Sequence, residues 1–466
     1  MNNDLLSCPP PENEQPDSPI KKRRSVPLLP FLAILLAVAV LSSFLVWFLV
    51  RRQADEEMRL LREEQAAAIE ALRAEQQAQT PLFDLKRLLA LDRLFAAHSL
   101  KGADGDALTE ALLDAYVEAT GDLYAAHYTS EEYVALLERQ NGRFVGIGVS
   151  VLSEPTALGL QILSVFKGSP AEKAGLLRGD LIVGVDGVSF EGMSAEDCAA
   201  LIRGEENTSV TVSVLREGAS LSFTMLRQSV AETTVTYKML DANVAYVQLL
   251  RFSEETPVQL QEAVSALKGA GAVAFVFDVR NNPGGLVNAV SECLGYLLPD
   301  GPLVRVNYKK QDQTYVMRSE GGLLYRTYGN GARDELKGVC DQSAVLSLPI
   351  AVLTNESTAS AGEIFAAVMR DYAEMHGVNA RLFGTKTFGK GVVQKTYRTG
   401  EGDAIKMTVA TYDPPYGDNY DGVGVTPNVT VTPMPGYESV LPEQLSPEKD
   451  LPLAAAAAWL REQASP

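Results

Sequence analysis

Residues 349–364 read PIAVLTNESTASAGEI, an apolar run followed by a turn of small and polar residues. The run Pro349–Thr354 shows no alternation of polar and apolar positions, which is typical of a strand buried on both faces. Ser360 and Glu363 then stand at the S-x-x-E spacing of a helix-capping box. The stretch therefore predicts a buried strand, a tight turn and a helix that begins near Ser360.

Two other stretches are also rich in small residues. Residues 272–286 read AVAFVFDVRNNPGGL, a buried strand that ends in a glycine turn, and residues 384–394 read GTKTFGKGVVQ. At the N-terminus of a helix, free N–H groups and the helix dipole favour negative charge. Ser360 at such a turn is well placed as a nucleophile, because neighbouring amides can stabilise a tetrahedral oxyanion. A nucleophilic serine can also cap its helix, so the two interpretations are compatible.

Together, the three stretches resemble the C-terminal processing peptidases, also called tail-specific proteases. The resemblance assigns the nucleophile to Ser360 rather than Ser357, from the pattern N-x-x-[S/T]-A-S-A-x-E. It assigns the general base to Lys390 and an accompanying glutamine to Gln394, from the pattern F-G-K-G-x-x-Q.

The same resemblance implies an oxyanion hole made of backbone amides. The D-x-R-x-N-x-G-G turn would supply Gly284 and Gly285, and the serine turn would supply Ala361. With flanking motifs at residues 124–133 and 422–427, the resemblance covers about residues 82–431. The chain departs from the family in two respects: Gly362 stands where the family often has serine, and the Ser360–Lys390 separation is a few residues longer than usual. A surface insertion at 373–380 is expected to account for this extra length.

A lysine base needs a physical account, since free lysine has a pKa near 10.4 and is protonated at neutral pH. Burial in an apolar pocket disfavours the charged form and lowers that pKa. A neutral Lys390 amine would then take the serine proton and return it to the leaving amine. Flanking glycines, Phe388 and Gln394 favour this role over that of an exposed cation, and Gln394 would hold the amine by a hydrogen bond.

Other catalytic arrangements find little support. A Ser-His-Asp alternative must use His98, His127 or His376, which lie in a helical region or in the expected insertion. The sequence has neither a G-x-S-x-G elbow nor an H-E-x-x-H motif. No metal site and no cofactor are therefore expected.

Residues 144–228 carry a glycine-rich loop, a strand, two glycine turns and a short helix, in an order that resembles PDZ domains built into bacterial proteases. Gly146, Ile147 and Gly148 would turn successive backbone N–H groups toward the carboxylate of a protein tail. The tail would then add as a strand beside residues 148–152. At the later glycines of this segment, a plain tight turn is the preferred interpretation.

A basic cluster at residues 21–24 precedes an uncharged apolar run from Val26 to Val50. This run is long enough to span a bilayer and longer than the apolar part of a signal peptide. Lys and Arg nearly balance across it, so charge alone does not fix its orientation, although the cluster favours a cytoplasmic N-terminus. Residues 54–79 favour a helix, either a coiled-coil stalk or a single solvated helix.

The net charge and the cysteine positions limit the binding partners and the covalent links that the sequence allows. The formal net charge of −18 disfavours nucleic acid. Cysteines stand at positions 8, 198, 293 and 340 without C-x-x-C spacing, and a disulfide between two of the last three is left open.

The expected fold is α+β, with a mixed-sheet protease core, an inserted PDZ domain, an N-terminal helical region and a single transmembrane helix. The predicted segments are a disordered tail (1–25), an anchor (26–50), a helical stalk (51–81), a helical region (82–142), a PDZ domain (143–228), a catalytic core (229–435) and a C-terminal tail (436–466).

The expected function is that of a membrane-anchored serine endopeptidase that recognises the C-terminal tails of proteins. It would sit in the bacterial cell membrane as a single-pass protein, with its catalytic part on the extracytoplasmic side. The stalk allows a homodimer, and an activating partner protein is left open. The rivals are a non-catalytic PDZ scaffold at the membrane, and an esterase or amidase acting on small molecules.

Overall fold

The computed structural model describes residues 84–152, 158–241, 243–338, 347–399, 402–437, 440, 442–446 and 448–464. The chain divides into two units, residues 1–103 and 104–466. In the first unit, α2 (Leu85–His98) begins at Asp84, whose carboxylate accepts two N–H groups of the first turn. The predicted anchor and stalk lie outside the described residues, and within those residues no helix combines the length and apolarity that a membrane span needs.

A six-stranded sheet of the second unit has the order β10-β11-β12-β17-β18-β21. β10 is antiparallel to its neighbour, and the other strands pair in parallel. The strands are β10 (Val235–Met239), β11 (Val244–Leu249), β12 (Ala274–Asp278), β17 (Ile350–Thr354), β18 (Ala380–Gly384) and β21 (Val429–Thr430). Every residue of β12 and β17 is buried, which confirms the two strands predicted from continuous apolar runs.

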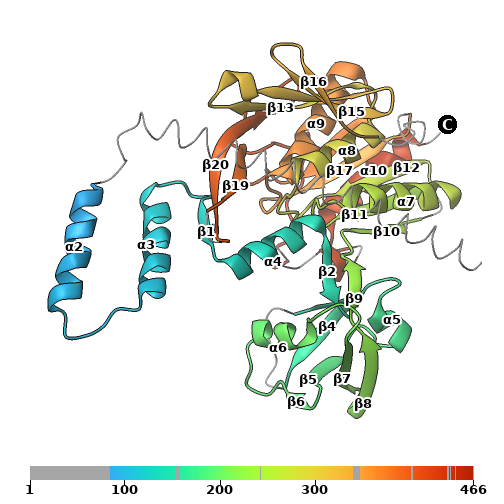
Figure 1. Ribbon diagram of the computed structural model, residues 1–466. Coiled ribbons are helices and arrows are strands. Elements are labelled where there is room, and N and C mark those ends of the chain that lie inside the picture. The colour runs from blue at the N-terminus through green and yellow to red at the C-terminus, as the bar shows by residue number, and fades with distance from the viewer. Residues whose placement is uncertain are drawn as a thin grey trace, which may run out of the picture. The chain divides into compact units, whose positions relative to one another are not determined.

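Both faces of this sheet are covered, because successive side chains of a strand point to opposite faces. Phe275 and Phe277 pack in a core with α7 (Thr256–Gly269), α8 (Val287–Leu297) and α9 (Ala361–His376). Ala274 and Val276 face the other way and pack with α10 (Leu451–Gln463). Figure 1 labels β12 and α10. The segment predicted as a C-terminal tail thus contributes a helix to the core.

A second sheet curves beside the first and has seven strands. Strand β20 pairs with β19 along one edge, and with β1 and β13 along the other. The outer strands follow in the order β13-β14-β15-β16. The bounds are β1 (Ala126–Tyr128), β13 (Gly301–Tyr308), β14 (Tyr315–Glu320), β15 (Leu323–Tyr328), β16 (Arg333–Gly338), β19 (Val392–Arg398) and β20 (Ala404–Asp413), with short turns η1 (Gln311–Gln313) and η3 (Pro442–Gln444).

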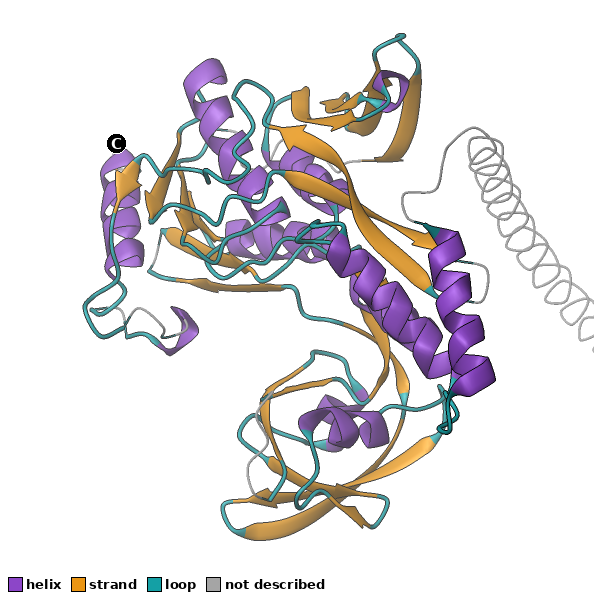
Figure 2. Cartoon of the chain, turned by 90° about the vertical axis from the view of Figure 1, so that its left-hand side faces the viewer, coloured by secondary structure: helices purple, strands orange, loops and turns teal. Residues whose placement is uncertain are grey.

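The segment predicted to be a PDZ domain has its own sheet and core. The sheet has the order β3-β4-β5-β7-β8, and β6 pairs with β5. Its elements are β3 (Val149–Val151), β4 (Leu160–Val165), α5 (Pro170–Ala174), β5 (Leu181–Val185), β6 (Val188–Ser189), α6 (Ala195–Ile202), β7 (Ser209–Arg216) and β8 (Ala219–Leu226). Figure 2 shows these strands curving about the short helices.

The chain enters and leaves this lobe through two paired strands. β2 (Arg143–Gly146) runs antiparallel to β9 (Gln228–Ala231), so the two ends of the lobe lie side by side, as is common for an inserted domain. Before β2 come α3 (Gly105–Ala119) and α4 (Ser130–Asn141). α4 begins with a complete capping box between Thr129 and Glu132.

The segment 373–380, expected to be a loop that holds a surface insertion, is partly helical. Residues 373–376 form the last turn of α9, which ends at Gly377 with a φ of 68°. Only three residues then separate the helix from β18, and most of the segment is exposed.

The thiols of Cys198 and Cys293 are both free and buried, so the disulfide that was left open does not join them. Each thiol packs inside a different apolar core.

Replacing Leu460 by Ala tests whether α10 is part of the core. Leu460 is fully buried against the sheet, so L460A is expected to lower the free energy of unfolding by about 2–5 kcal/mol. Urea unfolding of the full chain measures this, with the exposed Glu462→Ala on the same helix as the control. Equal stability of the two variants would show that α10 is dispensable.

Candidate active site

Three successive parallel strands end at the same edge of the six-stranded sheet. β12 leads into the turn of residues 278–285, β17 into the serine turn and β18 into the lysine turn. Because the carboxyl ends of parallel strands lie together, the three predicted motifs meet there. The fold thus brings Ser360 and Lys390 to one edge.

The first two turns are joined by reciprocal hydrogen bonds. The Asn281 N–H donates to Asn355 Oδ1 at 2.9 Å, and Asn355 Nδ2 donates to Asn281 Oδ1 at 2.7 Å. The Thr358 hydroxyl donates to the Val279 carbonyl at 2.8 Å. These contacts hold the serine turn against the glycine turn.

Ser360 stands at the start of α9 with φ 54° and ψ −118°. A residue other than glycine rarely adopts a positive φ, and the cost persists only where surrounding contacts enforce it. The Glu363 carboxylate accepts the Ser360 N–H at 2.9 Å, as expected from the S-x-x-E spacing. Burial raises the pKa of the nearby Tyr412 phenol, and the Ser360 side chain opposes that shift. Tyr412 also donates to the Lys390 carbonyl oxygen.

Glu363 connects the serine turn to the lysine turn. Its carboxylate is fully buried and accepts hydrogen bonds from the Thr387 hydroxyl at 2.6 Å, the Gly389 N–H at 2.6 Å and the Lys390 N–H at 2.8 Å. With the Ser360 N–H, four donors converge on this one side chain. The backbone positions of nucleophile and base are therefore fixed relative to each other.

The Lys390 ammonium lies over the ring of Tyr124, with Nζ 4.4 Å from the ring centroid. Burial lowers the pKa of Lys390, and the charge of Lys406 lowers it further, whereas Asp122 and Glu363 oppose the shift. The net direction is downward, as a lysine base requires. The apolar cover comes from Tyr124 and not from Phe388, whose side chain is 59% exposed.

Neither predicted partner of the base, Ser360 or Gln394, is hydrogen-bonded to the Lys390 amine in the described part of the chain. Among the described residues, no hydrogen bond joins Ser360 Oγ to Lys390 Nζ, whose recorded contact is with Tyr124. Gln394 Nε2 donates weakly to the Val392 carbonyl and to the Thr408 hydroxyl, both at 3.4 Å.

The three N–H groups predicted to bind the oxyanion differ in whether they already donate to another acceptor. Gly284 lies against the serine turn, where an added Cβ would stand 2.7 Å from the Ser360 Cβ. Its N–H, however, donates to Asn282 Oδ1 at 2.8 Å. The N–H groups of Gly285 and Ala361 have no acceptor within the described part of the chain. These two amides are thus the available donors of the predicted set.

The glycine loop of the other lobe leaves two amides without an acceptor among the described residues, those of Ile147 and Gly148. Gly148 has a φ of 82°, and a Cβ there would stand 2.3 Å from the Ser169 Cβ. Glycine is therefore required at this position. Gly146 belongs to β2 and pairs with Gln228. β3 stands at the edge of its sheet, where an added strand has room to pair.

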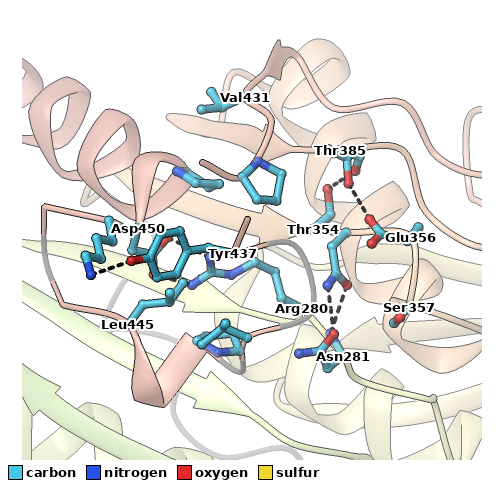
Figure 3. Close-up of a pocket in the computed structure, with 16 residues that line it drawn as sticks. Arg280, Asn281, Thr354, Glu356, Ser357, Thr385, Val431, Tyr437, Leu445 and Asp450 are labelled. Atoms are coloured by element: carbon cyan, nitrogen blue, oxygen red, sulfur yellow. Dashed lines mark hydrogen bonds and ion pairs between the residues drawn. The ribbon is translucent and has the colours of Figure 1, made fainter. Parts of the chain in front are cut away.

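A cavity of about 300 Å³ lies beside the serine turn, and Ser357 and Asn281 belong to its lining (Figure 3). Neither Ser360 nor Lys390 lines it. On its other side, the buried Arg280 donates to Asp278 at 2.6 Å and to Asp450 at 2.7 Å. These ion pairs fix the Arg280 side chain beneath the active-site turn.

A model of peptidase family S41 matches residues 243–431, and a PDZ domain model matches residues 161–216. The chain belongs to peptidase family S41 and carries a PDZ domain. The family match covers β11 through β21, and hence all three turns at the sheet edge.

Relatives of this S41 chain include probable CtpA-like serine proteases of staphylococci. That of Staphylococcus aureus strain N315 is 30% identical over 357 residues, covering 77% of this chain and 66% of the relative. That of Staphylococcus haemolyticus strain JCSC1435 is 31% identical over 333 residues, covering 72% and 62%. The chain thus spans slightly less than two thirds of these relatives. A solved photosystem II D1 C-terminal processing protease is 26% identical over 79% of this chain and 93% of that chain, with a TM-score of 0.40.

Sequence reasoning missed several residues of the site. Tyr412 and Thr408 lie on β20, and Asp122 and Tyr124 precede β1. No local motif marks them as neighbours of the lysine, although the segment at 124–133 was noted as a flanking motif. Glu363 was identified only as a helix cap.

Two of the three histidines have recorded partners away from the serine. His127 Nδ1 is 3.1 Å from Asp114 Oδ1, and His376 Nε2 is 2.7 Å from the Tyr416 hydroxyl. His98 lies in the first unit.

Replacing Glu363 by Gln tests its linking role in this S41 site. The amide cannot accept all four hydrogen bonds, so E363Q is expected to lower the free energy of unfolding by about 1–3 kcal/mol and to abolish cleavage. The control is Glu356→Gln, an exposed residue of the same turn. Urea unfolding and a cleavage assay report the two effects, and an E363Q protein that matches E356Q in both would contradict the assignment.

Proposed function

We propose that this S41 chain is a serine endopeptidase that cleaves proteins whose C-terminal tails its PDZ domain has bound. The observation that carries the proposal is the linkage of Ser360 to Lys390 through the buried Glu363 carboxylate at the sheet edge. Membership in the family and the lowered pKa of Lys390 support it.

The reaction is acyl transfer. Ser360 Oγ attacks the peptide carbonyl while the neutral Lys390 amine takes the hydroxyl proton. The N–H groups of Gly285 and Ala361 stabilise the oxyanion, and Lys390 returns the proton to the departing amine. Water then hydrolyses the acyl-enzyme: Lys390 takes a proton from the attacking water and returns it to Ser360 Oγ as the ester bond breaks. Before attack, Lys390 must lose the proton of its ammonium, which its lowered pKa favours.

The PDZ domain would select substrates by their ends. The amides of Ile147 and Gly148 would receive the terminal carboxylate, and the tail would pair along the edge strand β3. Main-chain pairing recognises an extended peptide of many sequences, so selectivity would come from the last side chains.

We also propose that the protein lies in the bacterial cell membrane, with residues 26–50 as a single span and the catalytic part on the extracytoplasmic side. The proposal rests on the length and apolarity of that run and on the basic cluster before it. Homodimer formation through residues 54–79 and activation by a partner protein stay proposals of the same kind.

The dyad is tested with Ser360→Ala and Lys390→Ala in the full chain, using an unfolded protein with a free C-terminal tail as substrate. Both variants are expected to lose cleavage by at least about a thousandfold while still binding a tail peptide. Ser357→Ala, in the same turn, is the matched control. If S360A cleaves normally, the nucleophile is misassigned, and if no form cleaves, the scaffold is the better description.

The pH dependence of kcat/KM follows from the charges around Lys390. Cleavage needs the neutral amine, so activity should rise with pH through the lowered pKa of Lys390. Lys406→Gln removes a positive charge that lowers this pKa, so the pKa rises and the acidic limb moves to higher pH. Lys395→Gln, on the neighbouring strand, serves as control. If the acidic limb of kcat/KM does not shift in K406Q, the charge of Lys406 does not influence the pKa of Lys390.

A further inference from the structure

The segment between α3 and β1 reaches the lysine turn, although nothing in the proposed mechanism assigns it a role. Within it, Asp122 Oδ1 accepts the Tyr124 N–H at 3.0 Å, and the Asp122 carbonyl accepts the Ala125 N–H at 3.1 Å. These bonds fold the segment into a tight turn that sets the direction of Tyr124.

The ring of Tyr124 covers the Lys390 ammonium at 4.4 Å. An aromatic face attracts a cation, so the ring holds the side chain of the base while excluding water from one side of it. Phe388, which stands two residues before the lysine, is exposed and is not the recorded ring contact of the ammonium.

Asp122 also binds strand β20. Its carboxylate accepts the Thr408 N–H at 2.7 Å and the Thr408 hydroxyl at 2.9 Å. Thr408 is the cross-strand neighbour of Gln394 and accepts a hydrogen bond from its amide. One carboxylate therefore connects the Tyr124 turn to the strand neighbour of the predicted catalytic glutamine.

We propose that Asp122 and Tyr124 are positioning residues for the base of this peptidase. Tyr124 holds the Lys390 side chain at its resting place, and Asp122 fixes both the ring and the strand that carries the partner of Gln394. The inference rests on the proposed function. It makes the helical region before β1 a required part of the active site.

The charged groups that face Lys390 come from several elements. Asp122 and Glu363 favour its charged form, and Lys406 of β20 opposes it. Burial raises the pKa of Tyr124, and the charges of Asp421, Glu363 and Asp122 raise it further, so the ring stays neutral beside the ammonium. The hydrogen bonds to Asp122 outweigh its burial and lower its pKa, so this carboxylate stays ionised.

The test measures kcat, KM and the pH profile of the full chain with a tailed substrate. Tyr124→Leu is expected to lower kcat by about tenfold or more with KM within about twofold, because the base loses its fixed position but the tail site is intact. Tyr124→Phe keeps the ring and should restore most of the lost kcat. Tyr237→Leu, another partly exposed tyrosine, is the matched control.

Asp122→Asn removes a negative charge near Lys390, so the pKa of the amine falls and the acidic limb of kcat/KM moves to lower pH. Its matched control is Asp241→Asn, because Asp241 also accepts two backbone N–H groups and has a lowered pKa. Melting temperature and tail-peptide binding show whether each variant is folded.

The outcomes separate this inference from the proposed function. If wild type cleaves and S360A and K390A do not, the function stands whatever Asp122 and Tyr124 do. In that case, a Y124L kcat equal to that of Y237L, or a D122N pH profile that matches D241N, overturns the positioning role. Loss of kcat in Y124L with recovery in Y124F, together with the limb shift in D122N, supports it.

Discussion

The buried carboxylate of Glu363 is the contact on which the site depends. It lies in the first turn of α9 and accepts hydrogen bonds from the serine turn and from the lysine turn. Charge-assisted bonds of this kind are short and strong, and a buried carboxylate without them would be very costly. The positive φ of Ser360 is tolerated because these contacts, with those from Asn282 and Thr358, leave the turn no other conformation.

The parts of the fold that sequence predicted are those with a strong local signal. β12 and β17 are continuous apolar runs, and such runs are typical of strands covered on both faces. The helix over Ala195–Ile202 and the glycine turns of the PDZ domain likewise have short-range patterns. The three motifs meet at one sheet edge because β12, β17 and β18 are neighbouring parallel strands, an arrangement that the sequence analysis did not specify.

The parts that sequence did not predict depend on contacts between distant residues. Tyr124 reaches Lys390 from 266 positions away, and no periodicity connects them. Phe388, adjacent in sequence, was the natural choice for the apolar cover of the lysine, yet a side chain two residues away on a glycine-flanked loop can point to solvent. Residues 373–376 were expected to belong to a surface loop, yet they form the last turn of α9.

The ion pair between Arg280 and Asp450 affects how the protein folds during synthesis on the ribosome. The two residues are separated by 170 positions. A ribosome that adds about 5–20 residues per second needs roughly ten to thirty seconds to reach the second carboxylate after making the arginine. During that interval the guanidinium beneath the active-site turn has Asp278 but not Asp450, and α10 has not yet covered the sheet. A nascent chain of this architecture therefore completes the support of its active-site turn only after residue 450 has been synthesised.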